Sequence, residues 1–185
     1  DVTFDMANNK MEVRQCKGEP GKVTLNNTGE DTMTGGRLKR VADYVKDEEA
    51  FCLTYGDGVS NVNITELIAF HKTQKVKATV TAAFPPGRFG ALDINGNKVN
   101  SFIEKPKGKD SMINAGFFVL SPQVIDYIED DRTLWERAPL ERLATEGELS
   151  AFHHYDFWQP MDTLRDKVYL EELWQSGKAP WRVWK

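Results

Sequence analysis

The chain has 185 residues, of which 40% are hydrophobic and 28% are charged, so it can build one sizeable core. Its 24 basic and 28 acidic residues give a net charge of −4, which argues against general binding to nucleic acid or to a membrane surface. No apolar run approaches the roughly 20 residues of a transmembrane helix. We therefore expect a single domain over residues 1–185, in which residues 163–185 form a C-terminal helix and tail.

The two cysteines, Cys16 and Cys52, are too few for a disulfide framework. They are typical of reduced thiols in a cytoplasmic protein. No signal peptide is recognisable at the start of the sequence, so we expect a cytoplasmic location.

The first elements in chain order are short. Residues 1–6 and 10–13 predict two strands of a hairpin around Asn8 and Asn9. A helix is predicted from residue 34, because Leu38 and Val41 begin an apolar stripe with helical spacing. Arg37 falls in its first turn, where a cation opposes the helix dipole, so it either faces a ligand or is a solvated surface arginine. The adjacent glycines at 35 and 36 would let a backbone approach a flat ligand such as a base.

Two isolated acids are the strongest candidates for chemistry. An apolar run at residues 50–55 ends in Asp57, which is held between two glycines. In α/β sheets an acid in this position lies at the ligand-binding edge, although Gly-Asp-Gly is also a common turn sequence. Asp162 lies where an extended segment gives way to a helix, so it could also be a helix-start acid stabilised by the dipole. Two such acids suit a divalent cation that bridges phosphates.

The rest of the chain alternates between strand and helix patterns. Residues 63–66 resemble a capping box, and strands are predicted at 78–83, 113–120 and 149–153, with an Asn-Gly hairpin near residue 95. We expect an α/β fold with a mixed, mostly parallel sheet flanked by helices. In it, the strand at 50–55 pairs in parallel with the strand at 78–83 as a βαβ unit. At the end of the hairpin, Glu104 could accept sugar hydroxyls and Lys105 could neutralise a phosphate, or the two could form a surface ion pair.

Six segments taken together resemble the sugar-phosphate nucleotidylyltransferase family. They are TGGRL at 34–38, YGDGV at 55–59, FPPGRFG at 84–90, EKPK at 104–107, NAGFF at 114–118 and WQPMDT at 158–163. The resemblance covers essentially all 185 residues and is greatest to the members that use CTP and glucose 1-phosphate. It implies a Rossmann-like nucleotidyltransferase fold, Mg²⁺ as cofactor, and synthesis of CDP-glucose and pyrophosphate. In bacteria this product feeds dideoxysugar synthesis for surface polysaccharide, including O-antigen.

The resemblance also implies roles for individual residues. Asp57, Lys105 and Asp162 would be catalytic, with the two aspartates holding Mg²⁺ against the α-phosphate of the nucleotide. The residues implied to bind the nucleotide are Thr32, Arg37 and Gly56. Those implied to bind the sugar phosphate are Gly90, Glu104, Lys105 and Asn114. No nucleophilic side chain is needed, because in-line attack of one phosphate on another depends on alignment and charge neutralisation.

The sequence departs from the family pattern at one point. It contains neither the family's glycine-rich Gly-Gly-x-Gly-Thr-Arg loop, which holds the triphosphate, nor the Pro-Lys-Pro segment that follows. We therefore expect the N-terminal βαβ unit to be absent and the 185 residues alone to give little or no turnover.

Two other functions remain open. The chain could be a sister transferase that uses UTP, dTTP or GTP, or a non-catalytic module that binds nucleotide sugars. The tryptophans near the C-terminus pack against the domain or lie at a subunit interface, and we expect a homo-oligomer.

Overall fold

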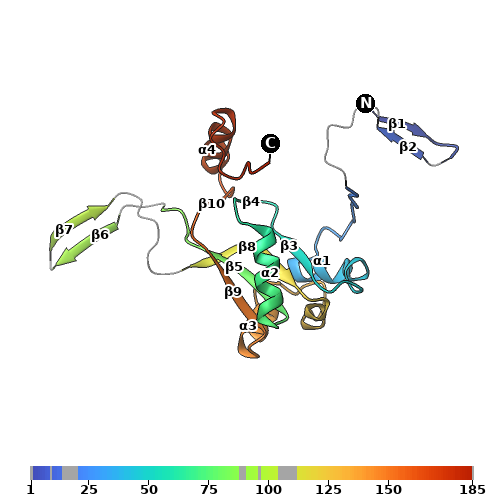
Figure 1. Ribbon diagram of the computed structural model, residues 1–185, viewed down its shortest axis with the longest axis horizontal. Helices are drawn as coiled ribbons and strands as arrows, with labels where there is room; N and C mark the ends of the chain where they lie inside the picture. The colour runs from blue at the N-terminus through green and yellow to red at the C-terminus, as the bar shows by residue number, and fades with distance from the viewer. Residues whose placement is uncertain are drawn as a thin grey trace.

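The computed structural model describes residues 2–8, 10–13, 21–87, 91–95, 97–103 and 112–184. Its centre is a four-stranded sheet with the order β3 (Phe51–Thr54), β8 (Ile113–Leu120), β5 (Ala78–Ala83) and β9 (Leu149–His154) (Figure 1). Strand β8 is antiparallel to both β3 and β5, whereas β5 and β9 are parallel. Three of the four strands therefore point the same way, as expected for a mixed α/β sheet.

The predicted direct pairing of β3 with β5 is wrong. Both strands instead pair with β8, which lies between them. A strand, helix, strand pattern determines that two strands point the same way but not that they are neighbours. Strand β8 suits the inner position because Ala115, Phe118, Val119 and Leu120 are all buried, whereas the residues of β3 alternate between half-buried and exposed.

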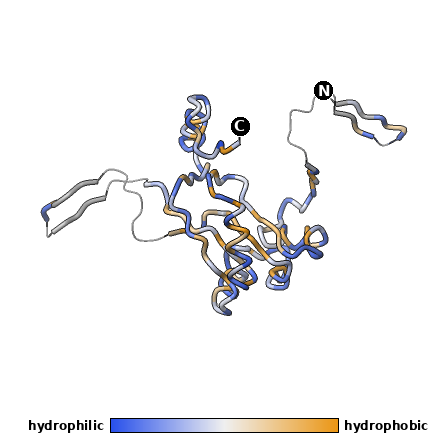
Figure 2. The backbone as a smooth tube through the Cα atoms, in the orientation of Figure 1, coloured by the Kyte–Doolittle hydropathy of each residue, from blue (hydrophilic) through white to orange (hydrophobic). Residues whose placement is uncertain are grey.

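Helices cover both faces of this sheet. On one face the core contains Leu38 of α1 (Thr34–Arg40), Val124 of the 3₁₀ helix η2 (Pro122–Tyr127) and Leu143 of α3 (Ala138–Thr145), packed with Ala78 and Phe118. Figure 2 shows hydrophobic residues concentrated along the central strands. A second, short 3₁₀ helix, η1 (Ala42–Tyr44), follows α1.

The opposite face is covered by α2 (Ile64–Gln74). His71 of α2 is buried, and its Nδ1 lies 2.8 Å from Oγ1 of Thr79, which faces away from Ala78 because neighbouring strand residues alternate. The predicted capping box is confirmed in part. Asn63 caps the helix because its side-chain oxygen accepts a 3.2 Å hydrogen bond from the Glu66 amide. The Glu66 carboxylate, however, accepts from the Asn63 side-chain amide rather than from the Asn63 backbone amide.

The remaining elements pair outside this sheet. Strands β4 (Gly58–Ser60) and β10 (Trp158–Pro160) form an antiparallel pair, and helix α4 (Leu164–Gln175) follows β10. The two predicted hairpins are confirmed, as β1 (Val2–Asp5) with β2 (Lys10–Val13) and β6 (Ala91–Asn95) with β7 (Lys98–Ile103). Within the described ranges, no helix is both long and apolar enough to cross a membrane.

The paired glycines of α1 allow a close approach to the protein's own chain rather than to a base. A Cβ atom on Gly36 would lie 2.5 Å from the carbonyl oxygen of Asp131, and one on Gly35 would lie 2.7 Å from that of Thr133. The amide of Gly35 also donates to Thr133 O at 3.0 Å. Because Gly35 and Gly36 have no side chains, α1 packs directly on the backbone of residues 131–133.

Candidate active site

Asp57 and Asp162 line one cavity. Asp57 lies in the turn between β3 and β4, and Asp162 follows β10 by two residues. Because β4 and β10 are paired with Gly58 opposite Pro160, both acids lie at the same end of this small sheet. The amide of Met161 completes the arrangement by donating to the carbonyl oxygen of Asp57 at 2.7 Å. The structure thus brings together two acids that the sequence predicted to act as a pair.

The cavity has a volume of about 410 Å³ and combines polar and apolar walls. Besides the two acids, its lining includes Asn114 at the start of β8, together with Tyr55, Pro85, Pro86 and Trp158. Trp158 links β10 to β8, because its indole Nε1 donates a 2.8 Å hydrogen bond to Ala115 O. A volume of this size holds a sugar phosphate.

The donor set fits Mg²⁺ in the way that phosphate-transfer sites use it. Within the described ranges, no group of three or more histidine, cysteine or acidic side chains could hold a metal ion. Mg²⁺ does not require such a group, because it is commonly held by one or two carboxylates, with substrate phosphates and water as the other ligands. Asp57 and Asp162 on the wall of one cavity supply those carboxylates.

The Asn114 side chain is oriented by two neighbours. Its Oδ1 accepts a 2.8 Å hydrogen bond from the Gly116 amide, and its Nδ2 donates to the Tyr55 hydroxyl at 3.4 Å. Burial raises the pKa of Tyr55 above its usual range, and hydrogen bonding to Glu136 raises it further, whereas the bond to Asn114 opposes the rise. Tyr55 therefore stays a neutral phenol whose oxygen can accept from Asn114.

The tyrosine is itself fixed by close packing. Its amide donates to Gly116 O at 3.0 Å, and its ring lies 5.8 Å from that of Phe118. Gly116 has φ +78°, and a Cβ atom there would lie 2.7 Å from the Tyr55 ring. Only glycine accommodates both the backbone conformation and the ring.

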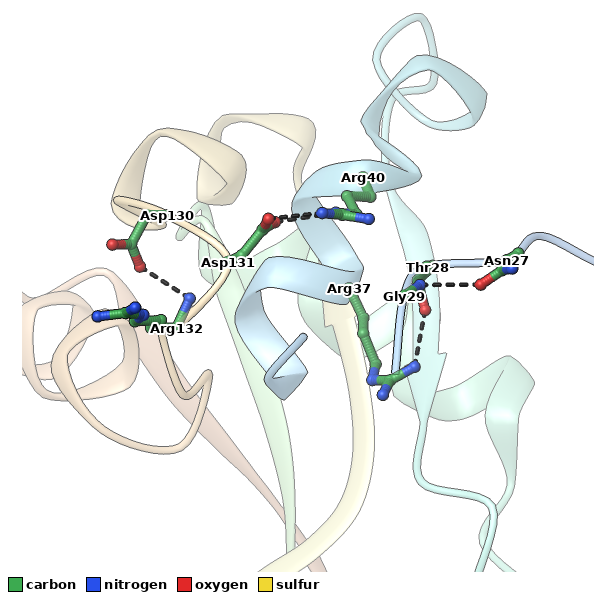
Figure 3. Close-up of polar contacts among 8 residues, drawn as sticks. All are labelled: Asn27, Thr28, Gly29, Arg37, Arg40, Asp130, Asp131 and Arg132. Carbon is green, nitrogen blue, oxygen red and sulfur yellow. Dashed lines mark hydrogen bonds and ion pairs between the residues drawn. The ribbon is translucent and has the colours of Figure 1, made fainter. Parts of the chain in front are cut away.

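Tyr55 also lines a second hollow, a mainly apolar groove of about 310 Å³ between α1 and β3. Arg37 is on the wall of this groove, and it holds the preceding loop (Figure 3). Its Nη1 donates to Thr28 Oγ1 at 2.8 Å and its Nη2 donates to Glu30 O at 3.1 Å. The arginine is thus neither purely solvated nor aimed solely at a ligand.

The other residues predicted to bind the nucleotide lie apart from the walls of these two hollows. Thr32 is buried just before α1, and Gly56 is exposed in the turn between Tyr55 and Asp57. Gly90, Glu104 and Lys105 lie outside the described residues and stay predictions.

Two residues of the cavity wall were not singled out by the sequence. Tyr55 and Trp158 belong to short segments that carry an acid, and each is half-buried. An aromatic residue two and four positions before the acid was the available signal. It is a weak one, because aromatic residues near strand ends are usually part of the core.

The family model described as nucleotidyl transferase matches residues 8–159. Glucose-1-phosphate cytidylyltransferases of Salmonella typhimurium and Salmonella typhi are each 64% identical over all 185 residues, which span 72% of their length. Mannose-1-phosphate guanyltransferase of Saccharomyces cerevisiae is 34% identical over 163 residues, which cover 82% of this chain and 45% of the yeast protein.

Solved structures share the fold. The crystal structure of HddC from Yersinia pseudotuberculosis aligns with a TM-score of 0.58 at 23% identity. The alignment covers 78% of this chain and 64% of HddC.

Proposed function

Because the chain belongs to the nucleotidyl transferase family, we propose that it transfers a cytidylyl group from CTP to α-D-glucose 1-phosphate, giving CDP-glucose and pyrophosphate. The observation that carries the proposal is the meeting of Asp57, Asp162 and Asn114 in one cavity. The 64% identity to proteins named glucose-1-phosphate cytidylyltransferase supports the choice of nucleotide and sugar.

The chemistry requires a phosphate oxygen of glucose 1-phosphate to attack the α-phosphorus of CTP. A phosphorus–oxygen bond to the sugar phosphate forms, and the bond to the pyrophosphate leaving group breaks. Asp57 and Asp162 would hold Mg²⁺, which supplies neutralisation of the phosphate charges. The protein's own task is alignment of the two phosphates, so the residues bind and orient rather than form covalent intermediates.

Individual residues take the roles that the sequence resemblance implies, and the positions of Asn114 and Arg37 on the walls of the two hollows support theirs. Asn114, with its amide held by Gly116 and Tyr55, hydrogen-bonds a sugar hydroxyl. Arg37 and Thr32 recognise the cytidine end, with Gly56 beside the nucleoside. Lys105 neutralises the sugar phosphate, while Glu104 and the backbone at Gly90 bind glucose; the sequence resemblance supports these last three.

We extend the proposal to the setting of the reaction. The product feeds dideoxysugar and O-antigen synthesis in the cytoplasm, and the enzyme is a homo-oligomer. Trp174 and Trp184 are 46% and 49% exposed near the C-terminus, which supports a subunit contact there. The resemblance of the sequence supports the pathway.

The test is pyrophosphate release from glucose 1-phosphate and Mg²⁺ with CTP, UTP, dTTP, GTP or ATP, using Asp57→Asn as the blank. Release with CTP, lost in the blank, supports the proposal. Faster release with another nucleotide would instead indicate a sister transferase. If no nucleotide gives release, CDP-glucose binding decides. CDP-glucose binding that requires Mg²⁺ and is lost in Asp162→Asn supports a transferase site. CDP-glucose binding that changes neither with Mg²⁺ nor with this substitution favours a non-catalytic module.

A further inference from the structure

Gln159 is a buried polar residue next to the proposed metal site. It is the middle residue of β10, is only 7% exposed, and precedes Asp162 by three positions. A buried amide destabilises a fold unless its polar atoms are paired. Here the Nε2 group donates twice, to Pro160 O at 3.1 Å and to Oδ1 of Asp166 at 2.9 Å.

Asp166 connects this amide to the start of α4. Its Oδ2 accepts from the Thr163 amide at 3.1 Å and from Thr163 Oγ1 at 2.8 Å. Thr163 in turn caps the helix by accepting from the Asp166 amide at 3.2 Å. One oxygen of this carboxylate therefore holds Gln159 and the other holds Thr163.

These contacts enclose the segment that carries Asp162. Pro160 O on one side accepts from Gln159 and the Thr163 amide on the other donates to Asp166, and these two side chains are bonded to each other. From the opposite direction, the Met161 amide is bonded to Asp57 O. The backbone of residues 160–163 is thus held both to helix α4 and to the turn that carries Asp57.

We infer that Gln159 is a positioning residue that fixes the Asp162 carboxylate beside Asp57 for a divalent cation. It acts through the 160–163 backbone and does not itself contact the metal or the substrate. The inference rests on the proposed function, because it takes Asp57 and Asp162 as the pair that holds Mg²⁺.

The role requires an amide donor of this length. Glutamate has the same shape but, when ionised, has no hydrogen to donate and would place a second carboxylate against Asp166. Methionine fills the space without any hydrogen bond. Gln159→Glu and Gln159→Met therefore remove the same contacts, the first with an added charge and the second without one. If Gln159→Glu does not fold, Gln159→Met still tests the inference.

The experiment is a Mn²⁺ titration in the presence of CDP-glucose, followed by water-proton relaxation, with thermal unfolding recorded for each variant. We expect both Gln159 variants to weaken Mn²⁺ affinity about five- to tenfold, which matches the loss of one or two hydrogen bonds. Gln123→Glu and Gln123→Met, on the exposed surface of η2, are matched controls that leave the affinity unchanged. A merely structural role would lower the melting temperature but leave the Mn²⁺ affinity of the folded protein unchanged.

Asp166→Asn tests the same contact from the other partner. Since both variants break one network, combining it with Gln159→Met should weaken Mn²⁺ affinity no further than the stronger single change. Mn²⁺ affinities that stay at the wild-type value in both Gln159 variants, while Asp57→Asn abolishes binding, would overturn the positioning role alone. Wild-type protein that binds no Mn²⁺ would overturn the proposed function and this inference together.

Discussion

The amide of Met161 donates to the carbonyl oxygen of Asp57 at 2.7 Å, so the two acid-bearing segments are joined through their backbones. Neither segment can shift without the other, because the pairing of β4 with β10 continues from this bond. The distance between the two carboxylates is therefore set by main-chain geometry rather than by long, flexible side chains.

The first prediction concerns these acids. Where the wild type releases pyrophosphate measurably, Asp57→Asn and Asp162→Asn should each reduce that release at least about 100-fold, because each removes a negative ligand from the metal while keeping the side-chain shape. The residual binding of CDP-glucose should no longer depend on Mg²⁺. Asp126→Asn, on the exposed surface of η2, is the matched control. Equal metal dependence in all three variants would exclude a shared metal site.

Arg37 offers a second test, on the nucleotide side. Lysine cannot span both Thr28 Oγ1 and Glu30 O, since it lacks the planar fork of the guanidinium group. Arg37→Lys should therefore weaken CTP binding about five- to tenfold in a calorimetric titration, and leave glucose 1-phosphate binding unchanged.

Arg40 provides its control, from the same helix. Its Nε and Nη2 both donate to Asp131, at 2.9 and 2.6 Å, and lysine would keep only one of these bonds (Figure 3). Arg40 is not on the wall of the groove, so Arg40→Lys should bind CTP like the wild type. The same loss in both variants would mean that α1 as a whole, rather than Arg37, affects the nucleotide.

A third prediction compares two glycines with nearly equal backbone angles. Gly116 has φ +78° and Gly177 has φ +71°, but only Gly116 faces another group, the Tyr55 ring. Gly177→Ala should lower the free energy of unfolding by about 1 kcal/mol through backbone strain alone. Gly116→Ala should lower it by about 2–4 kcal/mol, because overpacking adds to that strain. Urea denaturation measures the free energy of unfolding of both variants. An equal decrease in the two would show that the Tyr55 ring moves aside at little energetic cost.

The fourth prediction concerns pH. Burial lowers the pKa of His71 below its ordinary value of 6.5; Glu49 opposes this shift and Lys72 adds to it. Between the lowered pKa and 6.5, the unfolded chain binds more protons than the folded one, so stability rises with pH. The free energy of unfolding should therefore fall as the pH is lowered from 7 through this interval.

The corresponding measurement is urea denaturation at several pH values for the wild type and for His71→Gln. The variant should lose this part of the pH dependence. His153→Gln, at an exposed position, should keep it. If the free energy of unfolding of His71→Gln changes with pH as steeply as that of the wild type, the pH dependence comes from other groups.

The sequence predicted most of the local structure because its signals are local. Asn63 and Thr163 are polar residues followed by an acid three positions later, and both cap helices. Asp57 and Asp162 were each recognised from a strand that ends in an acid. The position of β8 could not be predicted in this way, because strand order depends on contacts between distant residues. The role of Gln159 was hidden for the same reason, since burial and its bond to Asp166 appear only in the folded chain.

The insertion of β8 between β3 and β5 also has a consequence for how the protein folds. Strand β3 ends at residue 54, but its partner β8 begins only at residue 113, so this edge of the sheet cannot close until the intervening chain has been made. Such long loops slow folding, because their closure entropy must be overcome before the contacts form. During synthesis, Asp57 therefore leaves the ribosome well before Asn114, which lines the same cavity, and the proposed active site is among the last parts of the molecule to form.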